Sequence, residues 1–315
     1  MSYRYSVVVP YHPTAISSSD IVAIGQAIKE IDPTLLWKPV NMALKGERDR
    51  FRVPSLPSIL LAFNGFPRTA LPEFTGPRVE TKPVHKAEQL RVLDAAGIRV
   101  PKWTRLDPET EIDPAEFGEN LIIKPTEKGA SLGRGITLIK TNEFKRFRDQ
   151  HAAKFLPKGR SAPIVQQHIP TGGMPESFRV IETLGQVVLV WRLWLVDNTP
   201  LNAPLNTLVL TKKVASNLGE RDRELCRNSE VEDFGLLIAS AFDSTVQGID
   251  ILRSSEDGKL YALEINMGNT WAFSGKLHHN SQTLIGVEPM QNQFNVFDTV
   301  AHATIRKAKE LLDVV

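Results

Sequence analysis

Two strand-like runs in the last third of the chain restrict its fold more than any other feature. Gly248-Ile-Asp-Ile-Leu-Arg253 and Leu260-Tyr-Ala-Leu-Glu-Ile-Asn266 are largely apolar and are joined by Ser-Ser-Glu-Asp-Gly258. An Asp-Gly pair between two such runs is a strong signal for a tight β-hairpin turn. The sequence therefore predicts an antiparallel hairpin over residues 248–266.

Three oxygen-bearing side chains converge on this hairpin. Side chains alternate along a strand, so Glu264 and Asn266 share one face, and folding back about Asp257 brings Asp250 level with Glu264. Burying two like charges this close together is unfavourable unless a cation compensates them. Oxygen ligands on a rigid hairpin suit Mg²⁺, with phosphates completing its coordination. Asp250, Glu264 and Asn266 are therefore candidate ligands, and exposed acids on an edge hairpin are the alternative.

A glycine-rich loop lies between two other strand-like runs, residues 121–125 and 136–139. It matches neither the P-loop nor the dinucleotide-binding pattern of glycines. Glycines let backbone N–H groups approach phosphate oxygens, Ser131 adds a hydroxyl donor, and Lys124 stands near the end of the strand that enters the loop. This loop is a candidate phosphate lid, and a plain surface hairpin is the alternative. Its glycines are Gly129, Gly133 and Gly135.

Two arginines interrupt apolar strand-like runs. Arg192 stands within Val187–Val196, which is otherwise entirely apolar, and Arg179 stands within Ser177–Ile181. An unpaired charge in such a run is strongly destabilising, so each arginine needs either a ligand or a carboxylate partner. Together with the lysines, the lid and the acidic hairpin, the two arginines favour phosphoryl chemistry.

The composition excludes several classes of protein. Lys and Arg number 38 and Asp and Glu 36, so the net charge is +2, which argues against a chain that coats nucleic acid or an anionic membrane. The single cysteine, Cys226, excludes an intrachain disulfide and a multi-cysteine metal site. The sequence has neither a secretion signal nor a run of roughly 18 apolar residues. We expect a cytoplasmic protein.

The length of 315 residues predicts two or three lobes rather than one core. We expect a mixed α/β fold with an N-terminal α/β lobe over residues 1–81, a lid-bearing lobe over 82–165 and a metal-bearing lobe over 166–315. The predicted helices are 21–31, 85–96, 141–156, 230–242 and 296–313, and a Ser-rich cap (Ser17, Ser18, Ser19 and Asp20) precedes the first of them. The predicted strands outside the hairpin are 5–10, 58–63, 121–125, 136–139, 164–170 and 187–196.

The order of these motifs resembles the ATP-grasp superfamily over residues 82–270, most closely its amide-forming ligases of the glutamate-ligase and glutathione-synthetase kind. The motifs that carry the resemblance are His85-Lys86 to Pro101, Ile123-Lys124-Pro125, Gly129 to Gly135, Ile164-Val-Gln-Gln-His-Ile169, Phe178-Arg179-Val180 and the hairpin with Asp250, Glu264 and Asn266. The ordered set is specific, whereas no single motif is decisive. The resemblance implies a nucleotide held between two α+β lobes.

The resemblance also implies roles for individual residues. Lys86 and Lys124 would contact ATP phosphates under the Gly129–Gly135 lid, Arg179 and Arg192 would stabilise the transferring phosphoryl group and the acyl intermediate, and the hairpin would hold one or two Mg²⁺. Gln166, Gln167 and His168 would form the hinge whose backbone binds the adenine edge, and Glu176 would stand near the ribose.

Several positions depart from the family pattern. Gln167 and Ser177 stand where acidic residues are common, Met267-Gly-Asn-Thr-Trp271 replaces a proline-containing segment, and Asn206 is not followed by a pair of glycines. The last two regions would line the acceptor site. The sequence therefore leaves both substrates open.

Three functions are compatible with this pattern. The first is a ligase that uses ATP to activate a carboxylate as an acyl phosphate, which an amine then converts to an amide. The second is a small-molecule kinase that stops at phosphoryl transfer, and the third is a nucleotide-binding module without turnover. The expected partners of the ligase are small-molecule carboxylate and amine substrates, with no nucleic acid and no membrane, and a homo-oligomer is possible.

Four further features carry little functional weight. His278-His279 is expected to be a satisfied loop pair rather than a carboxylate contact, and Cys226 to be inert. Trp271 is equally compatible with packing and with acceptor stacking. The C-terminal helix is expected to serve as core or as an oligomer contact.

Overall fold

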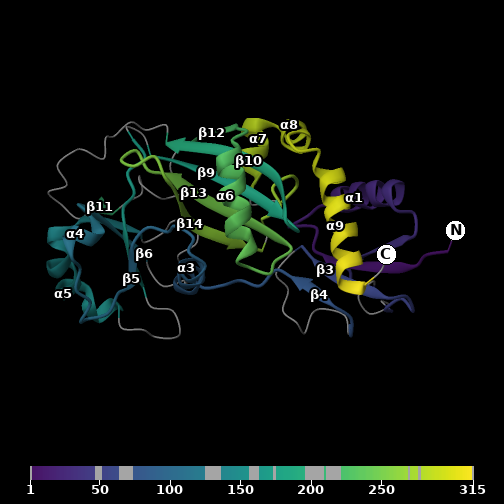
Figure 1. Cartoon of the computed structure of the whole chain (residues 1–315), viewed down its shortest axis with the longest axis horizontal. Helices are drawn as coiled ribbons and strands as arrows, with labels where there is room; N and C mark the ends of the chain where they lie inside the picture. The colour runs from purple at the N-terminus through teal and green to yellow at the C-terminus, as the bar shows by residue number, and fades with distance from the viewer. Residues whose placement is uncertain are drawn as a thin grey trace.

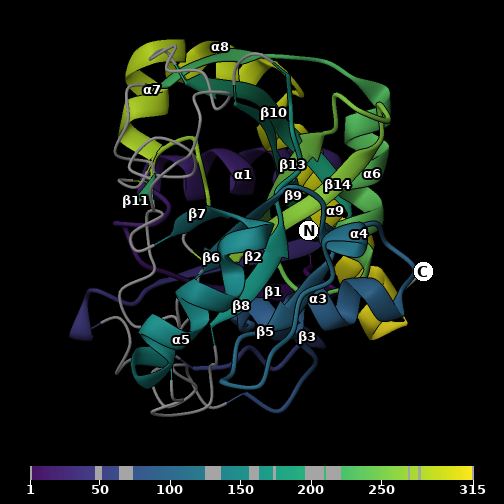
Figure 2. The ribbon, with the colours of Figure 1, turned by 90° about the vertical axis from the view of Figure 1, so that its left-hand side faces the viewer.

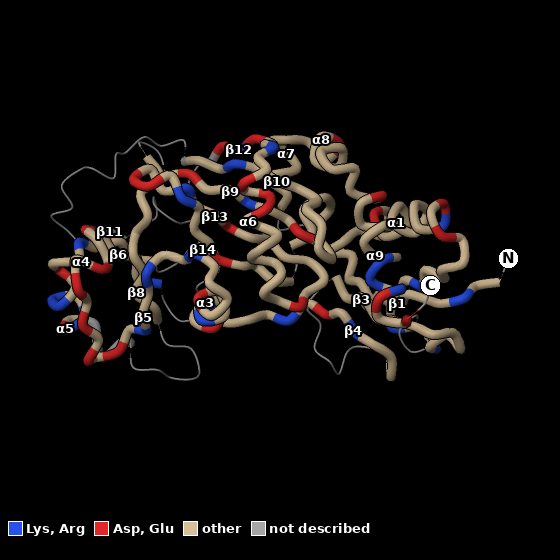
Figure 3. Tube along the Cα trace, in the orientation of Figure 1, with Lys and Arg blue, Asp and Glu red and all other residues tan. Residues whose placement is uncertain are grey.

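A computed structural model describes residues 2–46, 52–63, 74–124, 136–155, 163–172, 175–195, 209–210, 221–268, 270–275 and 278–313. Within these residues the chain forms three sheets. The sheets follow one another along the long axis of the molecule, so the structure has two end lobes and a central sheet (Figure 1). Figure 3 shows basic and acidic residues interspersed along all three parts, in keeping with the near-neutral charge.

The first lobe is a parallel sheet of order β2-β1-β3-β4 with a helix, α1, packed against it. Every residue of β1 is buried, which explains its apolar sequence. Ser17 begins α1 as the sequence predicts, because its hydroxyl accepts a hydrogen bond from the Asp20 backbone N–H. The elements are β1 Tyr5–Tyr11, α1 Ser18–Ile31, β2 Leu35–Asn41, β3 Ser58–Ala62 and β4 Arg78–Glu80.

The C-terminal helix α9, Val296–Leu312, packs against α1 and shares its hydrophobic core. Small buried side chains such as Ala301 and Ala308 allow this contact. Both chain ends therefore lie at the same end of the molecule (Figure 1). The expectation of a core role for this helix is confirmed, but the core is shared with the first lobe, which is distant in sequence.

The second end lobe is a sheet of order β11-β7-β6-β8-β5, which faces the viewer in Figure 2. Helix α5 packs beneath it through Phe144 and Phe147, which share a core with Leu121 and Val165. The elements are β5 Trp103–Arg105, α4 Pro114–Phe117, β6 Asn120–Lys124, β7 Thr137–Lys140, the short 3₁₀ helix η3 Thr141–Glu143, α5 Phe144–Phe155, β8 Ile164–Gln167 and β11 Val209–Leu210.

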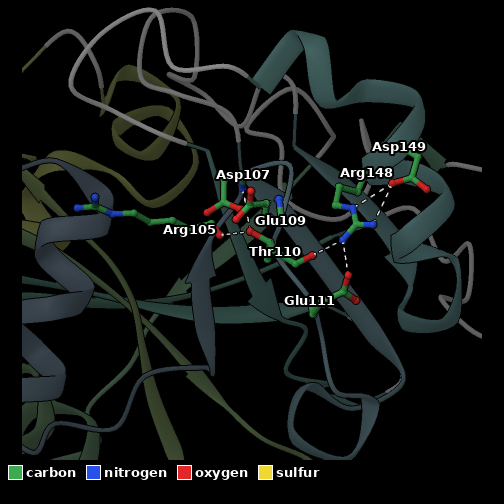
Figure 4. A network of polar contacts seen from close by, with 7 residues as sticks. All are labelled: Arg105, Asp107, Glu109, Thr110, Glu111, Arg148 and Asp149. Atoms are coloured by element: carbon green, nitrogen blue, oxygen red, sulfur yellow. Dashed lines mark hydrogen bonds and ion pairs between the residues drawn. The ribbon is translucent and has the colours of Figure 1, made fainter.

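A polar network ties the segment after β5 to α5 (Figure 4). The buried guanidinium of Arg148 donates to the Thr110 carbonyl at 2.8 Å and to the Glu111 carboxylate at 2.7 Å. Its other nitrogens bind Asp149. Thr110 in turn donates to the Arg105 carbonyl at 2.9 Å. The network is structural, because all these groups satisfy one another within the lobe.

The central sheet is antiparallel, with order β12-β10-β9-β13-β14. Helix α6 covers one face, and Gly235 lets it approach closely, since a Cβ there would lie only 2.9 Å from Val180. Part of the other face packs on the first lobe through residues such as Ile181 and Trp191. The elements are α3 Lys86–Ala95, β9 Glu176–Thr183, β10 Gln186–Leu195, β12 Arg221–Leu225, α6 Ser229–Ser240, β13 Val246–Arg253, β14 Leu260–Met267, α7 His279–Ile285 and α8 Val287–Asn292.

The register of the central sheet decides which side chains share a face. Asp250 pairs with Arg179 on β9 and with Glu264 on β14, and Arg179 pairs with Trp191 on β10. Directly paired residues of antiparallel strands point to the same side. These four side chains therefore lie on the face opposite α6, which we call the site face.

None of the helices among the described residues combines the length and apolar character that a membrane crossing requires.

Candidate functional site

The acidic hairpin has the register that its sequence predicts. Asp250 pairs with Glu264 and Gly248 pairs with Asn266, and a bulge follows Asp250. The turn lies at the predicted place, with Gly258 at a φ of 70°, where a residue without a side chain is favoured. Two carboxylates and one amide are thus held next to one another on the site face.

Cationic side chains already bind both carboxylates. The Arg179 guanidinium donates to Asp250 through Nε and through Nη2, the latter at 2.7 Å. Asn266 Nδ2 donates to Asp250 Oδ2 at 3.2 Å. Lys86 Nζ lies 3.1 Å from Glu264. The two acids and two cations therefore form a charge-balanced group on the site face.

Lys124 brings a third cation to this group from the second end lobe. It is buried at the end of β6, and burial lowers the pKa of its ammonium to about 8, with Glu264 partly offsetting and Lys86 reinforcing that effect. Burial acts in the opposite direction on the pKa of the Glu264 carboxyl. Burial raises its pKa, but Lys86, Lys124 and Arg179 outweigh burial and hold the pKa below its usual range. The site thus lies where the second lobe meets the central sheet.

A residue that the sequence analysis missed, Gln89, positions Lys86. The buried Gln89 amide donates to the carbonyl of Ile265 at 2.7 Å and accepts from the N–H of Ile265 at 3.1 Å. It also donates to the carbonyl of Val84 at 2.9 Å. These bonds fix the first turn of α3 against β14, so that Lys86 reaches Glu264. The only sequence signal is a polar residue on the buried face of the helix.

The oxygen donors of the hairpin have the chemistry that Mg²⁺ prefers. Asp250, Glu264 and Asn266 are adjacent in register, and their charge is now balanced by Arg179 and Lys86. Across the described ranges no group of three His, Cys, Asp or Glu side chains is close enough to hold a metal ion. The hairpin alone therefore offers a partial set of ligands, which oxygens from a bound substrate would have to complete.

The predicted nucleotide hinge lies on β8. Gln166 is completely buried, and neither its Oε1 nor its Nε2 has a hydrogen-bond partner among the described residues. The backbone N–H groups of Gln167 and His168 donate to the carbonyls of Lys102 and Asn120 at 2.7 and 3.0 Å. Burial lowers the pKa of the His168 imidazole. Among the described residues, the Gln166 side chain is therefore the part of the hinge whose polar atoms are available to a ligand.

Arg192 does not lie with Arg179. A one-residue bulge at Val188 shifts the pairing of β10 with β9, so that Trp191 stands opposite Arg179 and Arg192 stands opposite Phe178 on the α6 face. There Arg192 binds Glu176 through Nε at 3.0 Å and through Nη2. The expectation of a site shared by the two arginines is therefore wrong, and Arg192 has the alternative partner, a carboxylate.

Glu176 is the residue expected near the ribose, and in this structure its carboxylate binds Arg192 on the α6 face.

The lid residues fall outside the described part of the chain. They are Gly129, Ser131, Gly133 and Gly135.

Trp271 is a core residue. It is almost completely buried, it packs edge-on against Phe63 and Phe273, and its indole N–H donates to Asp20 at 2.7 Å. Burial raises the pKa of the Cys226 thiol to about 11, with Glu224 and Glu232 adding to it, which agrees with an inert cysteine. His278 is buried rather than exposed, and the centre of its ring lies 5.9 Å from that of the Trp191 ring.

No protein-family model matches the chain, and no curated protein sequence matches it either. Solved structures match it over nearly its whole length. The D-cycloserine synthetase DcsG is 12% identical, with a TM-score of 0.56, over 96% of this chain and 100% of its own. The ATP-grasp ligase PsnB, in a complex with Mg, ADP and a phosphomimetic variant of a minimal precursor, is 16% identical, with a TM-score of 0.55, over 98% and 100%. A RimK domain protein from Sphaerobacter thermophilus DSM 20745 is 12% identical, with a TM-score of 0.50, over 95% and 98%.

Proposed function

Since the chain has the ATP-grasp fold, we propose that it is an ATP-dependent carboxylate–amine ligase that forms an amide bond through an acyl phosphate. One observation carries the proposal: three cations and two carboxylates converge where the second lobe meets the central sheet. The neighbour DcsG is named a D-cycloserine synthetase and the neighbour PsnB an ATP-grasp ligase, and PsnB was solved with ADP and with AMPPNP. The converging residues are Lys86, Lys124, Arg179, Asp250 and Glu264.

The proposed reaction has two steps. A substrate carboxylate oxygen attacks the γ-phosphorus of ATP, the bond from that phosphorus to the bridging oxygen breaks, and ADP leaves. The amine of the second substrate then attacks the acyl carbon and loses a proton, and inorganic phosphate leaves with the electron pair of its carbon–oxygen bond. No side chain needs to act as a nucleophile, so the protein contributes positioning and charge stabilisation.

The cations divide this work. Lys86 and Lys124 neutralise the phosphate oxygens, and Lys124 remains protonated at neutral pH even though its pKa is lowered to about 8. Arg179 stabilises negative charge on the transferring phosphoryl group. Its pair with Asp250 keeps the guanidinium on the site face before any substrate binds.

Asp250, Glu264 and Asn266 would hold one or two Mg²⁺ together with phosphate oxygens. Such an ion would neutralise part of the negative charge of the phosphate oxygens. Gln166 would bind the adenine edge, because its amide is buried and without a partner among the described residues. Gln167, His168, Glu176 and the lid glycines remain predictions. Arg192 is left out of the reaction, since it lies on the other face of the sheet.

The proposal is tested with purified full-length protein, Mg·ATP and mixed pools of amino acids, other carboxylic acids and short peptides. We expect release of ADP and phosphate in one pool, together with a product whose mass is that of the two substrates minus water. Asp250→Asn and Glu264→Gln should each reduce this release at least about a hundredfold. Arg192→Leu, the control on the opposite face, should retain it.

Other outcomes would replace the proposal. ADP formation with a stable phosphorylated product and no amide would identify a kinase. Mg·ADP binding without turnover in any pool would indicate a nucleotide-binding module. If Asp250→Asn and Glu264→Gln both keep full activity, the metal assignment is wrong.

A further inference from the structure

A second cluster of polar side chains lies on the site face beyond Arg179, away from the metal-binding acids. Arg223 on β12 pairs with Leu193 on β10, two residues from Trp191, which itself pairs with Arg179. Residues two apart on a strand share a face, so the side chains of Arg223 and Arg179 are both on the site face. The ring of His278 lies 5.9 Å from that of Trp191. We call Trp191, Arg223 and His278 the β12 cluster.

Two donors of the β12 cluster are buried without acceptors. Arg223 Nε and Trp191 Nε1 have no hydrogen-bond partner among the described residues, although Arg223 also donates through Nη1 to the Ser281 hydroxyl. Trp191 is 2% exposed, so water does not satisfy its indole N–H in this conformation. A buried donor without an acceptor destabilises the folded state, because it has lost its hydrogen bonds to water and gained none. Two such donors near one another indicate a place where a ligand supplies the acceptors.

Among the described residues, the charge around the β12 cluster is positive. Burial lowers the pKa of His278 to about 4, and Arg179 and Arg223 lower it further. Burial also lowers the pKa of Arg223, with Arg179 adding to that effect and Asp222 partly offsetting it. Asp250 is already bound to Arg179, and the neighbouring acids Asp222 and Glu224 alternate onto the other face of β12. Within the described residues, the cluster therefore presents donors and positive charge but no carboxylate of its own.

We propose that the β12 cluster is an oxyanion-binding subsite next to Arg179, in which Arg223, the Trp191 indole and His278 donate to one bound anion. Its ligand chemistry is that of a carboxylate or a phosphoryl group. The anion would be either a substrate carboxylate or the phosphoryl group being transferred, so the assignment of its source rests on the proposed function. The binding of an oxyanion follows from the donors alone.

The test uses full-length protein labelled with ¹⁵N-tryptophan, whose five indole N–H groups give five resonances. Trp191→Phe assigns one of them, and if that variant does not fold, individual replacement of Trp37, Trp103, Trp194 and Trp271 assigns it by elimination. Sodium acetate and sodium phosphate are titrated separately at constant ionic strength with sodium chloride. The other indole resonances report whether each variant is folded.

We expect a saturable shift of the Trp191 resonance, because a free N–H gains an acceptor. Arg223→Leu should raise the apparent Kd at least about tenfold, as loss of a charged hydrogen bond predicts, while Arg192→Leu should leave it unchanged. A shift with acetate identifies a carboxylate site, and a shift with phosphate alone identifies a phosphoryl site. The proposal is overturned if neither anion moves the resonance, or if Arg223→Leu binds as tightly as the wild type.

A parallel titration with Mg·ADP separates the two proposals. If Mg·ADP does not bind but the anion shift persists, the ligase proposal fails and the oxyanion subsite stands. If Mg·ADP binds and no anion shift occurs, the subsite fails and the ligase proposal is unaffected.

Discussion

Arg179 and Asp250 stand directly opposite each other on β9 and β13 and are joined by two hydrogen bonds from one guanidinium to one carboxylate. Both side chains are largely removed from solvent. Such a pair contributes little net stability compared with apolar residues, but removing one partner leaves the other charge buried. Its role is to hold a cation and an acid at set positions on the site face.

Asp250→Ala should therefore destabilise the fold by about 3 kcal/mol, because the Arg179 charge loses its bound partner. The double variant Arg179→Met with Asp250→Leu should recover most of that loss in urea unfolding, yet remain inactive. If the double variant is no more stable than Asp250→Ala, the ion pair is not the source of the effect.

Lys124 should make nucleotide binding sensitive to pH. Its ammonium has a pKa of about 8, so the charge is present below that pH and is lost as the pH rises through it. We expect the affinity for Mg·ADP, measured by calorimetry, to fall between pH 7 and pH 9. Lys124→Met should bind weakly at both pH values and show no such fall. An equal fall in that variant would assign the pH dependence to another group.

Gln89→Met should impair nucleotide binding, although Gln89 itself is not expected to contact the nucleotide. The methionine fills the same space but loses the bonds to Ile265 and Val84, so Lys86 is no longer held beside Glu264. We expect the KM for ATP to rise about tenfold with kcat changed less, the signature of lost ground-state binding.

The matched control on the same helix is Arg91→Met, since Arg91 is exposed and pairs only with Glu88 among the described residues. This variant should leave KM and kcat unchanged. A purely structural role for Gln89 would lower the amount of folded protein and leave the KM for ATP of the remainder intact.

Glu182 should make the fold less stable at alkaline pH. Burial raises the pKa of its carboxyl to about 7, although the N–H of Gly185 and the side chain of Gln247 act against that rise. The folded state thus holds a proton that the unfolded chain releases near its ordinary pKa of 4.5. The free energy of unfolding is therefore greatest below pH 4.5 and declines as the pH rises from 4.5 through about 7.

Glu182→Gln should abolish this decline, which amounts to ~2–3 kcal/mol between pH 4.5 and pH 7.5. Urea unfolding of wild type and variant at pH 5 and pH 8 measures the difference. Glu224→Gln, at an exposed position of β12, is the control and should follow the wild type. Parallel curves for wild type and Glu182→Gln would exclude Glu182 as the titrating group.

The features that sequence predicts here depend on local rules. The Asp257-Gly258 turn and the alternation of side chains predict that Asp250 lies level with Glu264, and the structure agrees. The helix cap at Ser17 also follows from neighbouring residues. The ATP-grasp fold itself was predicted from the order of motifs and is confirmed.

Tertiary structure alone decided which other side chains lie on the site face, because their placement depends on pairing between strands that are distant in sequence. One extra residue in β10, Val188, reverses the faces of all the following side chains, and it therefore removes Arg192 from the site and places Trp191 opposite Arg179. Arg223 stands in a charged run typical of an exposed strand, and only its pairing with Leu193 brings it onto the site face. Strand register is set by long-range hydrogen bonds and packing, which local sequence patterns do not encode.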